Sequence, residues 1–158
     1  MPRPIRLLVL DVDGVLTDGR LYFGPRGEAL KVFHVRDGLG MVELQRAGVR
    51  IAVISGRRSP MVAARCRELG VGEVHQGVAD KLKVLNAILK RTGIRADECA
   101  CVGDDLPDLP LMRHVARAFA VADAVPEVRA AAHTVTRLPG GAGAVREVCD
   151  RLRPRRRR

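Results

Sequence analysis

Residues 5–19 read IRLLVLDVDGVLTDG, and this stretch decides how the rest of the chain is interpreted. Apart from Arg6, its first half is apolar, which is typical of a parallel strand that is buried on both faces. The apolar run ends at Asp11, and Asp13 and Gly14 follow at once. The pattern predicts a buried first strand that delivers two carboxylates, Asp11 and Asp13, at its carboxyl end.

The rest of the chain alternates between strand-like and helical patterns. Two further apolar runs, RIAVIS (50–55) and CACVGD (99–104), have the form of the first strand, and shorter strands are predicted over 117–121 and 133–136. Helical patterns cover residues 37–47, 59–70, 79–91, 105–114, 126–131 and 143–152. This alternation predicts an α/β fold with a doubly wound parallel sheet, a three-layer, Rossmann-like arrangement.

Residues 19–34 break the alternation, because two strand-like runs flank the turn residues Gly24-Pro25-Arg26-Gly27. This pattern predicts a β-hairpin flap directly after the first strand. The intervals from Asp11 to Ser55 and from Ser55 to Lys81 are filled by the predicted elements. They leave no room for a cap domain, an inserted domain that would close over the site. The hairpin is rich in apolar residues, and exposed apolar patches mark interfaces. We therefore expect an oligomer in which a neighbouring subunit covers the site.

Composition bounds the remaining possibilities. The chain has 158 residues, of which 47% are hydrophobic and 29% charged, and this favours one globular domain over 1–152 with a basic tail over 153–158. Without the six arginines of residues 151–158, the formal net charge falls from +10 to +4. No apolar run is long enough for a membrane span, and no signal peptide or paired cysteine motif is evident. We expect a cytoplasmic protein with no membrane partner.

Chemistry-bearing side chains follow the predicted strands. Ligands of α/β sheets bind beyond the carboxyl ends of the strands. The residues predicted at that edge, besides Asp11 and Asp13, are Ser55, Gly56, Arg57, Lys81, Asp104, Asp105 and Asp108. Clustered carboxylates repel one another unless a cation is present, and an oxygen-rich site that also takes a phosphate suits Mg²⁺. Asp11 could then attack phosphorus, and Asp13 could protonate the leaving oxygen.

The motifs DVDGVLTDG, ISGR, the lysine of DKL, and GDDLPDLP resemble, in order and spacing, those of the haloacid dehalogenase superfamily of phosphatases. Residues 18–40, 54–71, 75–82 and 138–150 also resemble the family that hydrolyses 3-deoxy-D-manno-octulosonate 8-phosphate. The resemblance covers roughly residues 6–152 and leaves out only the arginine tail. It implies a Mg²⁺-dependent phosphatase of lipopolysaccharide precursor synthesis that acts through an aspartyl-phosphate.

The resemblance also implies a role for each matching residue. Asp11 would be the nucleophile, Asp13 the general acid and base, and Asp11, Asp104 and the Asp13 carbonyl would bind Mg²⁺. Ser55, Gly56 and Lys81 would hold the phosphoryl group, with Asp105 and Asp108 in support. Arg57 and Arg65 are candidates for the sugar-acid carboxylate, which suits the arginine fork. The family forms tetramers through the hairpin, and Gly140–Gly143 and Arg146 would lie near a neighbour's active site.

Three alternatives stay open from the sequence. The superfamily motifs do not separate an eight-carbon substrate from a nine-carbon sugar acid 9-phosphate of the sialic-acid type. A nucleic-acid-binding protein that uses the basic tail is a remote alternative, because the acid cluster would repel a phosphate backbone. A non-catalytic relative of the fold is the third, but its signature would be the loss of Asp11 or Asp13, and both are present.

Overall fold

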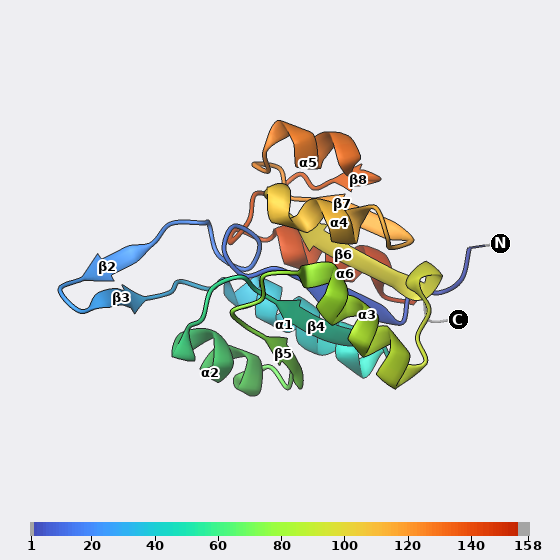
Figure 1. Cartoon of the computed structure of the whole chain (residues 1–158), viewed down its shortest axis with the longest axis horizontal. Helices are drawn as coiled ribbons and strands as arrows, with labels where there is room; N and C mark the ends of the chain where they lie inside the picture. Colours follow the sequence, from blue (N-terminus) through green and yellow to red (C-terminus); the bar gives the residue numbers. More distant parts are fainter. Residues whose placement is uncertain (1, 155–158) are drawn as a thin grey trace.

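The computed structural model describes residues 2–154, and its centre is a sheet of six parallel strands (Figure 1). The strand order is β5-β4-β1-β6-β7-β8. The strands are β1 (Leu7–Leu10), β4 (Arg50–Ile54), β5 (Glu73–His75), β6 (Cys99–Gly103), β7 (Arg117–Ala120) and β8 (Thr134–Val135). Because β1 lies between β4 and β6 and is covered on both faces, each of its four residues is buried. The predicted doubly wound parallel sheet is confirmed.

Helices cover both faces of the sheet. In Figure 1, α3 (Lys81–Thr92) lies in front of the sheet, whereas α1 (Val35–Arg46) and α6 (Ala144–Leu152) lie behind it and pack against each other. The layer in front also holds α4 (Leu109–Met112), which contacts both α3 and α5 (Pro126–Ala131). The remaining elements are α2 (Pro60–Glu68) and the 3₁₀ turns η1 (Ala96–Glu98) and η2 (Leu106–Asp108). The three-layer prediction is therefore confirmed.

The ends of two helices follow signals that the sequence carries. Ser59 caps α2, since its hydroxyl accepts a hydrogen bond from the Met61 N–H at 3.2 Å. The Asp80 carboxylate accepts from the Lys83 N–H at 3.0 Å and caps α3, which ends at Gly93 in the left-handed conformation. Lys81 thereby becomes the first residue of α3, at the carboxyl edge of the sheet.

The predicted helix over 105–114 is not continuous in the structure. The structure has the turn η2 and then the one-turn helix α4. Proline has no N–H to donate and its ring crowds the preceding turn, so Pro107 and Pro110 interrupt a regular helix. The break leaves Asp108 between the two pieces, where its side chain points back toward the end of β6.

The hairpin projects away from the rest of the molecule (Figure 1). It consists of β2 (Tyr22–Gly24) and β3 (Gly27–Leu30), paired antiparallel as a separate two-stranded sheet. The connections from β1 to α1 and from β4 to α3 hold only this hairpin, α2 and β5, which agrees with the prediction of no cap domain.

Two other expectations concern membrane-spanning helices and the basic tail. Within residues 2–154, no helix combines the length and apolar character that crossing a bilayer requires. The last helix, α6, ends at Leu152. Residues 155–158 of the predicted basic tail lie outside the described residues.

Candidate active site

A polar pocket of about 400 Å³ opens at the carboxyl edge of the sheet. Its walls come from the segments that follow β1, β4 and β6 and from the start of α3. The sequence-predicted residues that line it are Asp11, Asp13, Ser55, Gly56, Arg57, Lys81, Asp104 and Asp105. The strand order explains the convergence, because β1 is paired directly with both β4 and β6. Residues distant in sequence therefore meet at one edge.

Lys81 joins two carboxylates at the floor of this pocket. Its Nζ atom lies 3.1 Å from Asp11 Oδ1 and 2.8 Å from Asp108 Oδ1, and its side chain is only 5% exposed. The second Asp108 oxygen accepts hydrogen bonds from the N–H groups of Asp104 and Asp105. Burial lowers the pKa of Lys81, but the carboxylates of Asp11 and Asp108 raise it further, so the net shift is upward. Lys81 is therefore a fixed positive charge.

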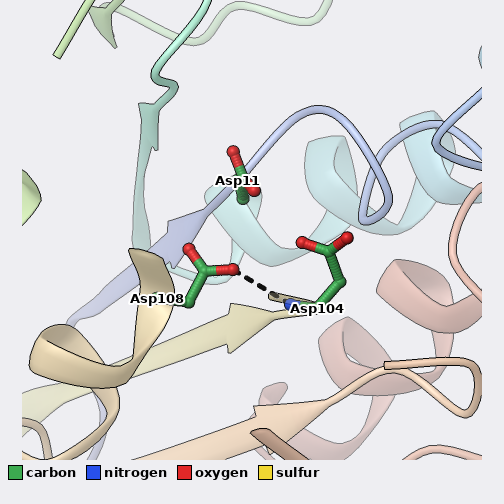
Figure 2. Close-up of side chains that lie close together, drawn as sticks. All are labelled: Asp11, Asp104 and Asp108. Carbon is green, nitrogen blue, oxygen red and sulfur yellow. Dashed lines mark hydrogen bonds between the residues drawn. The ribbon is translucent and has the colours of Figure 1, made fainter. Parts of the chain in front are cut away.

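Three carboxylates crowd around one position beside Lys81. Oxygen atoms of Asp11, Asp104 and Asp108 all lie within 4.8 Å of one another, and Figure 2 shows the three side chains at the ends of β1 and β6 and on the turn after β6. Burial and the charge of Asp108 raise the pKa of Asp11 to about 6. Burial and the charges of Asp11 and Asp108 raise the pKa of Asp104 to about 8. The single positive charge of Lys81 is thus not enough to neutralise the three carboxylates.

Two observations fit a divalent cation between Asp11 and Asp104. Asp104 Oδ1 is buried and has no hydrogen-bond partner among the described residues, although a buried carboxylate oxygen costs free energy unless it is paired. Both oxygens of Asp108, in contrast, already accept hydrogen bonds. Gly14 keeps the space clear, because a Cβ there would overlap Asp104 Oδ2. The oxygen donors of Asp11 and Asp104 suit Mg²⁺.

The loop after β1 is braced from within. The N–H groups of Leu16 and Thr17 donate to the carbonyl of Val12, at 2.9 and 3.1 Å. The buried Thr17 hydroxyl accepts from the N–H groups of Gly14 and Gly19, both at 3.2 Å. Sequence reasoning missed Thr17. A threonine three residues after a glycine in a turn was the signal available, because such hydroxyls commonly bond to nearby backbone groups.

The glycine-rich loop of residues 139–143 packs against the loop after β1 from outside. The Gly141 N–H donates to the Val15 carbonyl at 3.1 Å. A Cβ on Gly140 would overlap the Gly14 carbonyl oxygen, and one on Gly141 would overlap the Thr17 backbone. These contacts account for both glycines within the chain, and the expected contact with a neighbour's site stays a prediction.

The buried carboxylate of Asp37 fixes the helix that follows this loop. Gly143, the N-cap of α6, has no side chain to cap it, and Asp37 Oδ1 accepts from the Arg146 N–H at 2.9 Å instead. Arg146 is thus held by its backbone at the start of α6, while its side chain pairs with Asp150 at 3.0 Å. Asp37 therefore sets where the glycine-rich loop approaches the loop after β1.

Ser55 lies where the sequence predicts, between two backbone hydrogen bonds. Its N–H donates to the His75 carbonyl at 2.9 Å, and its carbonyl accepts from the Val78 N–H at 3.0 Å. The buried side chain is thereby held at the pocket wall, between the Asp11 and Lys81 segments.

Arg57 and Arg65 do not share a site within one chain. Arg57 lines the pocket, whereas Arg65 lies outside it on α2. The Arg65 guanidinium is 5.9 Å from the centroid of the Phe33 ring and 3.1 Å from Glu68. Of the two candidates for the sugar-acid carboxylate, only Arg57 therefore lies at the pocket of its own chain.

Two hairpin residues that the sequence reasoning missed reach the pocket wall. Lys31 Nζ lies 2.6 Å from Asp13 Oδ1 and 3.2 Å from Glu28, and Glu28 also pairs with Arg57 at 3.0 Å. The available signal was two opposite charges in the otherwise apolar stretch EALKVF. Their partners lie far away in sequence, so this signal alone did not show that they join the site.

Comparisons with known proteins agree with this fold. A family model of haloacid dehalogenase-like hydrolases matches residues 67–145. The Escherichia coli K12 protein KdsC, a 3-deoxy-D-manno-octulosonate 8-phosphate phosphatase, is 48% identical over 94% of this chain and 79% of its own length. Both matches point to the same class, the haloacid dehalogenase-like hydrolases.

Solved structures narrow the class further. A Yersinia pestis phosphatase of the same name superposes with a TM-score of 0.92 at 46% identity, over 94% of this chain and 80% of that one. The Moraxella catarrhalis phosphatase, solved with magnesium, phosphate and KDO, has a TM-score of 0.91 at 42% identity, over 94% and 85% of the two chains. This chain belongs to the family of 3-deoxy-D-manno-octulosonate 8-phosphate phosphatases.

A substitution that adds one methyl group tests the contact between the glycine-rich loop and the loop after β1. We expect Gly140→Ala to lower activity at least about tenfold, since the loop that carries Asp13 must shift and small misplacements are costly. Gly72→Ala is the matched control, because a Cβ at Gly72 meets nothing within 4 Å. Phosphate release by the two purified variants is the measurement. Equal activities would show that the close approach is unimportant.

The acid cluster predicts how stability depends on pH. The pKa of Asp104 is raised from 3.8 to about 8 on folding, so the folded, metal-free protein binds more protons than the unfolded chain in this interval. The free energy of unfolding should therefore fall as the pH rises from about 4 to 8. Mg²⁺ should offset the loss, and its stabilising effect should be larger at pH 8 than at pH 5.5.

Thermal unfolding with chelator and with Mg²⁺ at both pH values measures this effect. Asp104→Asn removes the titrating group, so it should flatten the pH dependence of the chelated protein and weaken the response to Mg²⁺. A chelated wild-type protein that gains stability between pH 5.5 and 8 would contradict the electrostatic analysis of the cluster.

Proposed function

We propose that this protein hydrolyses 3-deoxy-D-manno-octulosonate 8-phosphate to the free sugar acid and phosphate, with Mg²⁺ as its cofactor. The observation that carries this proposal is the paired arrangement at one sheet edge: Asp11 bound to the buried Lys81, beside the unpartnered oxygen of Asp104. The 48% identity to KdsC supports the substrate. The product is a precursor of lipopolysaccharide.

Residues at the pocket floor bind the cation and the phosphoryl group. Asp11, Asp104 and the Asp13 carbonyl hold Mg²⁺, which neutralises negative charge on the carboxylates and the phosphate when it is bound. The Ser55 hydroxyl, the Gly56 backbone and the Lys81 ammonium hold the phosphoryl oxygens. Lys81 suits this task because it is already fixed at 3.1 Å from the Asp11 oxygen.

Hydrolysis proceeds in two steps that share the same two carboxyl groups. An Asp11 oxygen attacks phosphorus and forms an aspartyl-phosphate, while the bond from phosphorus to the sugar oxygen breaks and Asp13 donates a proton to that oxygen. Water then attacks phosphorus and gives a proton to Asp13, while the bond from phosphorus to the Asp11 oxygen breaks. Phosphate is released and the Asp11 carboxylate is restored. Asp13 thus acts first as the acid and then as the base.

Asp105 and Asp108 support these groups. Asp108 holds Lys81 at 2.8 Å and two backbone N–H groups beyond β6, so it orients the lysine toward Asp11. Asp105 lines the pocket, and its carboxylate caps η2 through the Leu106 N–H at 2.8 Å. Arg57 binds the sugar-acid carboxylate from the pocket wall. Arg65 reaches the substrate only if a neighbouring subunit presents it.

The assembly proposed is a homotetramer built through the hairpin. Five apolar side chains of the hairpin region are substantially exposed: Leu21, Tyr22, Phe23, Leu30 and Val32. Such a patch on one small element favours an interface, and a neighbour seated there would cover a pocket that has no cap domain.

Domain organisation and location complete the proposal. Residues 1–152 act as a single phosphatase domain, and residues 153–158 are a basic tail outside the catalytic machinery. The protein works in the cytoplasm. The four cysteines, which are free and buried, are compatible with a reducing compartment.

Phosphate release from a panel of sugar phosphates tests the function. We expect Mg²⁺-dependent hydrolysis with selectivity for 3-deoxy-D-manno-octulosonate 8-phosphate over nine-carbon 9-phosphates and hexose phosphates. Asp11→Asn should lower kcat by at least about 1,000-fold, since a neutral amide is a poor nucleophile. Preference for a nine-carbon acid would keep the mechanism and change the substrate. A folded, Mg²⁺-loaded protein without activity would refute the enzymatic function.

Light scattering tests the assembly. Phe23 is 65% exposed at the hairpin, and we expect Phe23→Glu to convert the tetramer into smaller species because a buried charge opposes association. Ala130→Glu, on the exposed side of α5, is the matched control and should leave the mass unchanged. A wild-type protein that is monomeric at all concentrations tested would contradict the proposed tetramer.

A further inference from the structure

Lys31 is a buried lysine that the reaction described above does not use. It follows β3 at the base of the hairpin, and its side chain is 3% exposed. Its Nζ atom lies 2.6 Å from Asp13 Oδ1 and 3.2 Å from Glu28. A buried ammonium is costly unless it is paired, so the contact with Asp13 is a strong, charge-assisted hydrogen bond that fixes one oxygen of that carboxyl group.

A ring of alternating charges surrounds this contact. Glu28 holds Lys31 on one side and Arg57 on the other, with Arg57 Nη2 at 3.0 Å, and Arg57 Nε returns to Asp13 Oδ2 at 3.8 Å. Two members of the ring belong to the hairpin and two to the edge of the sheet. The position of the Asp13 side chain therefore depends on where the hairpin lies.

The two lysines of the site have separate partners. Lys81 contacts Asp11 and Asp108 at the pocket floor, whereas Lys31 contacts Asp13 at the wall. Neutralising the metal-binding carboxylates is therefore the task of Lys81. Lys31 faces the one carboxyl group that must stand beside the leaving oxygen rather than beside the cation.

We propose that Lys31 is a positioning residue that holds the Asp13 carboxyl group where it can transfer a proton to the leaving oxygen. The proposal rests on the function of Asp13 proposed above. The hairpin is then part of the acid–base machinery as well as a candidate interface. Only the ammonium of Lys31 is needed for this role, because it is the group that contacts Asp13.

Leaving-group dependence tests the proposal. An alkyl phosphate needs a proton on its leaving oxygen, whereas p-nitrophenyl phosphate does not, because nitrophenolate is a stable anion. We expect Lys31→Met to lower kcat/KM for the sugar phosphate about 100-fold and that for p-nitrophenyl phosphate less than about fivefold. Lys31→Arg, which keeps a charged donor, should recover most of the loss. A merely structural lysine would change both esters equally.

A double-mutant cycle shows whether Lys31 acts through Asp13. Asp13→Asn should reproduce the leaving-group dependence, and adding Lys31→Met to it should cause no further fall in kcat/KM for the sugar phosphate. Multiplicative losses in the double variant would overturn the proposal. Lys90→Met, at an exposed site in the last turn of α3, is the matched control and should leave both esters unchanged.

Folding and function are checked separately. Thermal unfolding with and without Mg²⁺ shows whether each variant folds and binds the cation, and Lys31→Gln replaces Lys31→Met if the latter does not fold. If the wild-type protein prefers another alkyl phosphate, the proposed substrate fails, and the same comparison with that ester decides the role of Lys31. Hydrolysis of the aryl ester alone by the wild-type protein would overturn both proposals.

Discussion

The crowding of negative charge between β1 and β6 is the constraint on which the rest of the site depends. The two strands are neighbours, so Asp11 and Asp104, which follow them, are forced together, and Asp108 folds back onto the same place. Lys81 balances part of this charge. Removing a buried partner of this kind typically costs about 3–5 kcal/mol, because the charges left behind stay buried. The unpaired oxygen of Asp104 marks the negative charge that Lys81 leaves unbalanced, and a divalent cation can neutralise it. Charge balance thus couples the fold to its cofactor.

Close packing of two loops gives this charge arrangement its geometry. The segment after β1 and the glycine-rich loop before α6 are more than 120 positions apart in sequence, yet the backbone of Gly140 contacts that of Gly14. The helix that follows is capped by Asp37 from α1 rather than by its own residues. A buried carboxylate on one helix therefore sets the position of another helix, of its leading loop, and finally of the loop that carries Asp13. The shape of the pocket therefore depends on a side chain, that of Asp37, that does not line it.

Local patterns predicted what depends on local physics. The buried strand before Asp11, the cap at Ser59 and the end of α3 at Gly93 each follow from a few neighbouring residues, and the edge rule for parallel sheets then brings the strand-end residues together. The contacts of Lys31 with Asp13 and of Gly140 with Gly14 have no local signal, because they arise only when distant segments approach. Arg65 lies on α2 outside the pocket of its own chain for a related reason: a motif gives the order of residues along the chain but not the direction in which each side chain faces.

The two roles proposed for the hairpin are physically linked. A two-stranded ribbon is marginally stable in water by itself, so its position must be fixed by contacts at its ends. At its base, Lys31 and Glu28 bind Asp13 and Arg57 at the pocket wall. At its tip, the exposed side chain of Phe23 offers an apolar surface to another molecule. Contacts at the tip restrict the whole ribbon, and the restriction extends to Lys31 because the strands between them are short. The proposed assembly through the hairpin and the proposed alignment of the Asp13 carboxyl group therefore depend on the same element, so a change at either end would be felt at the other.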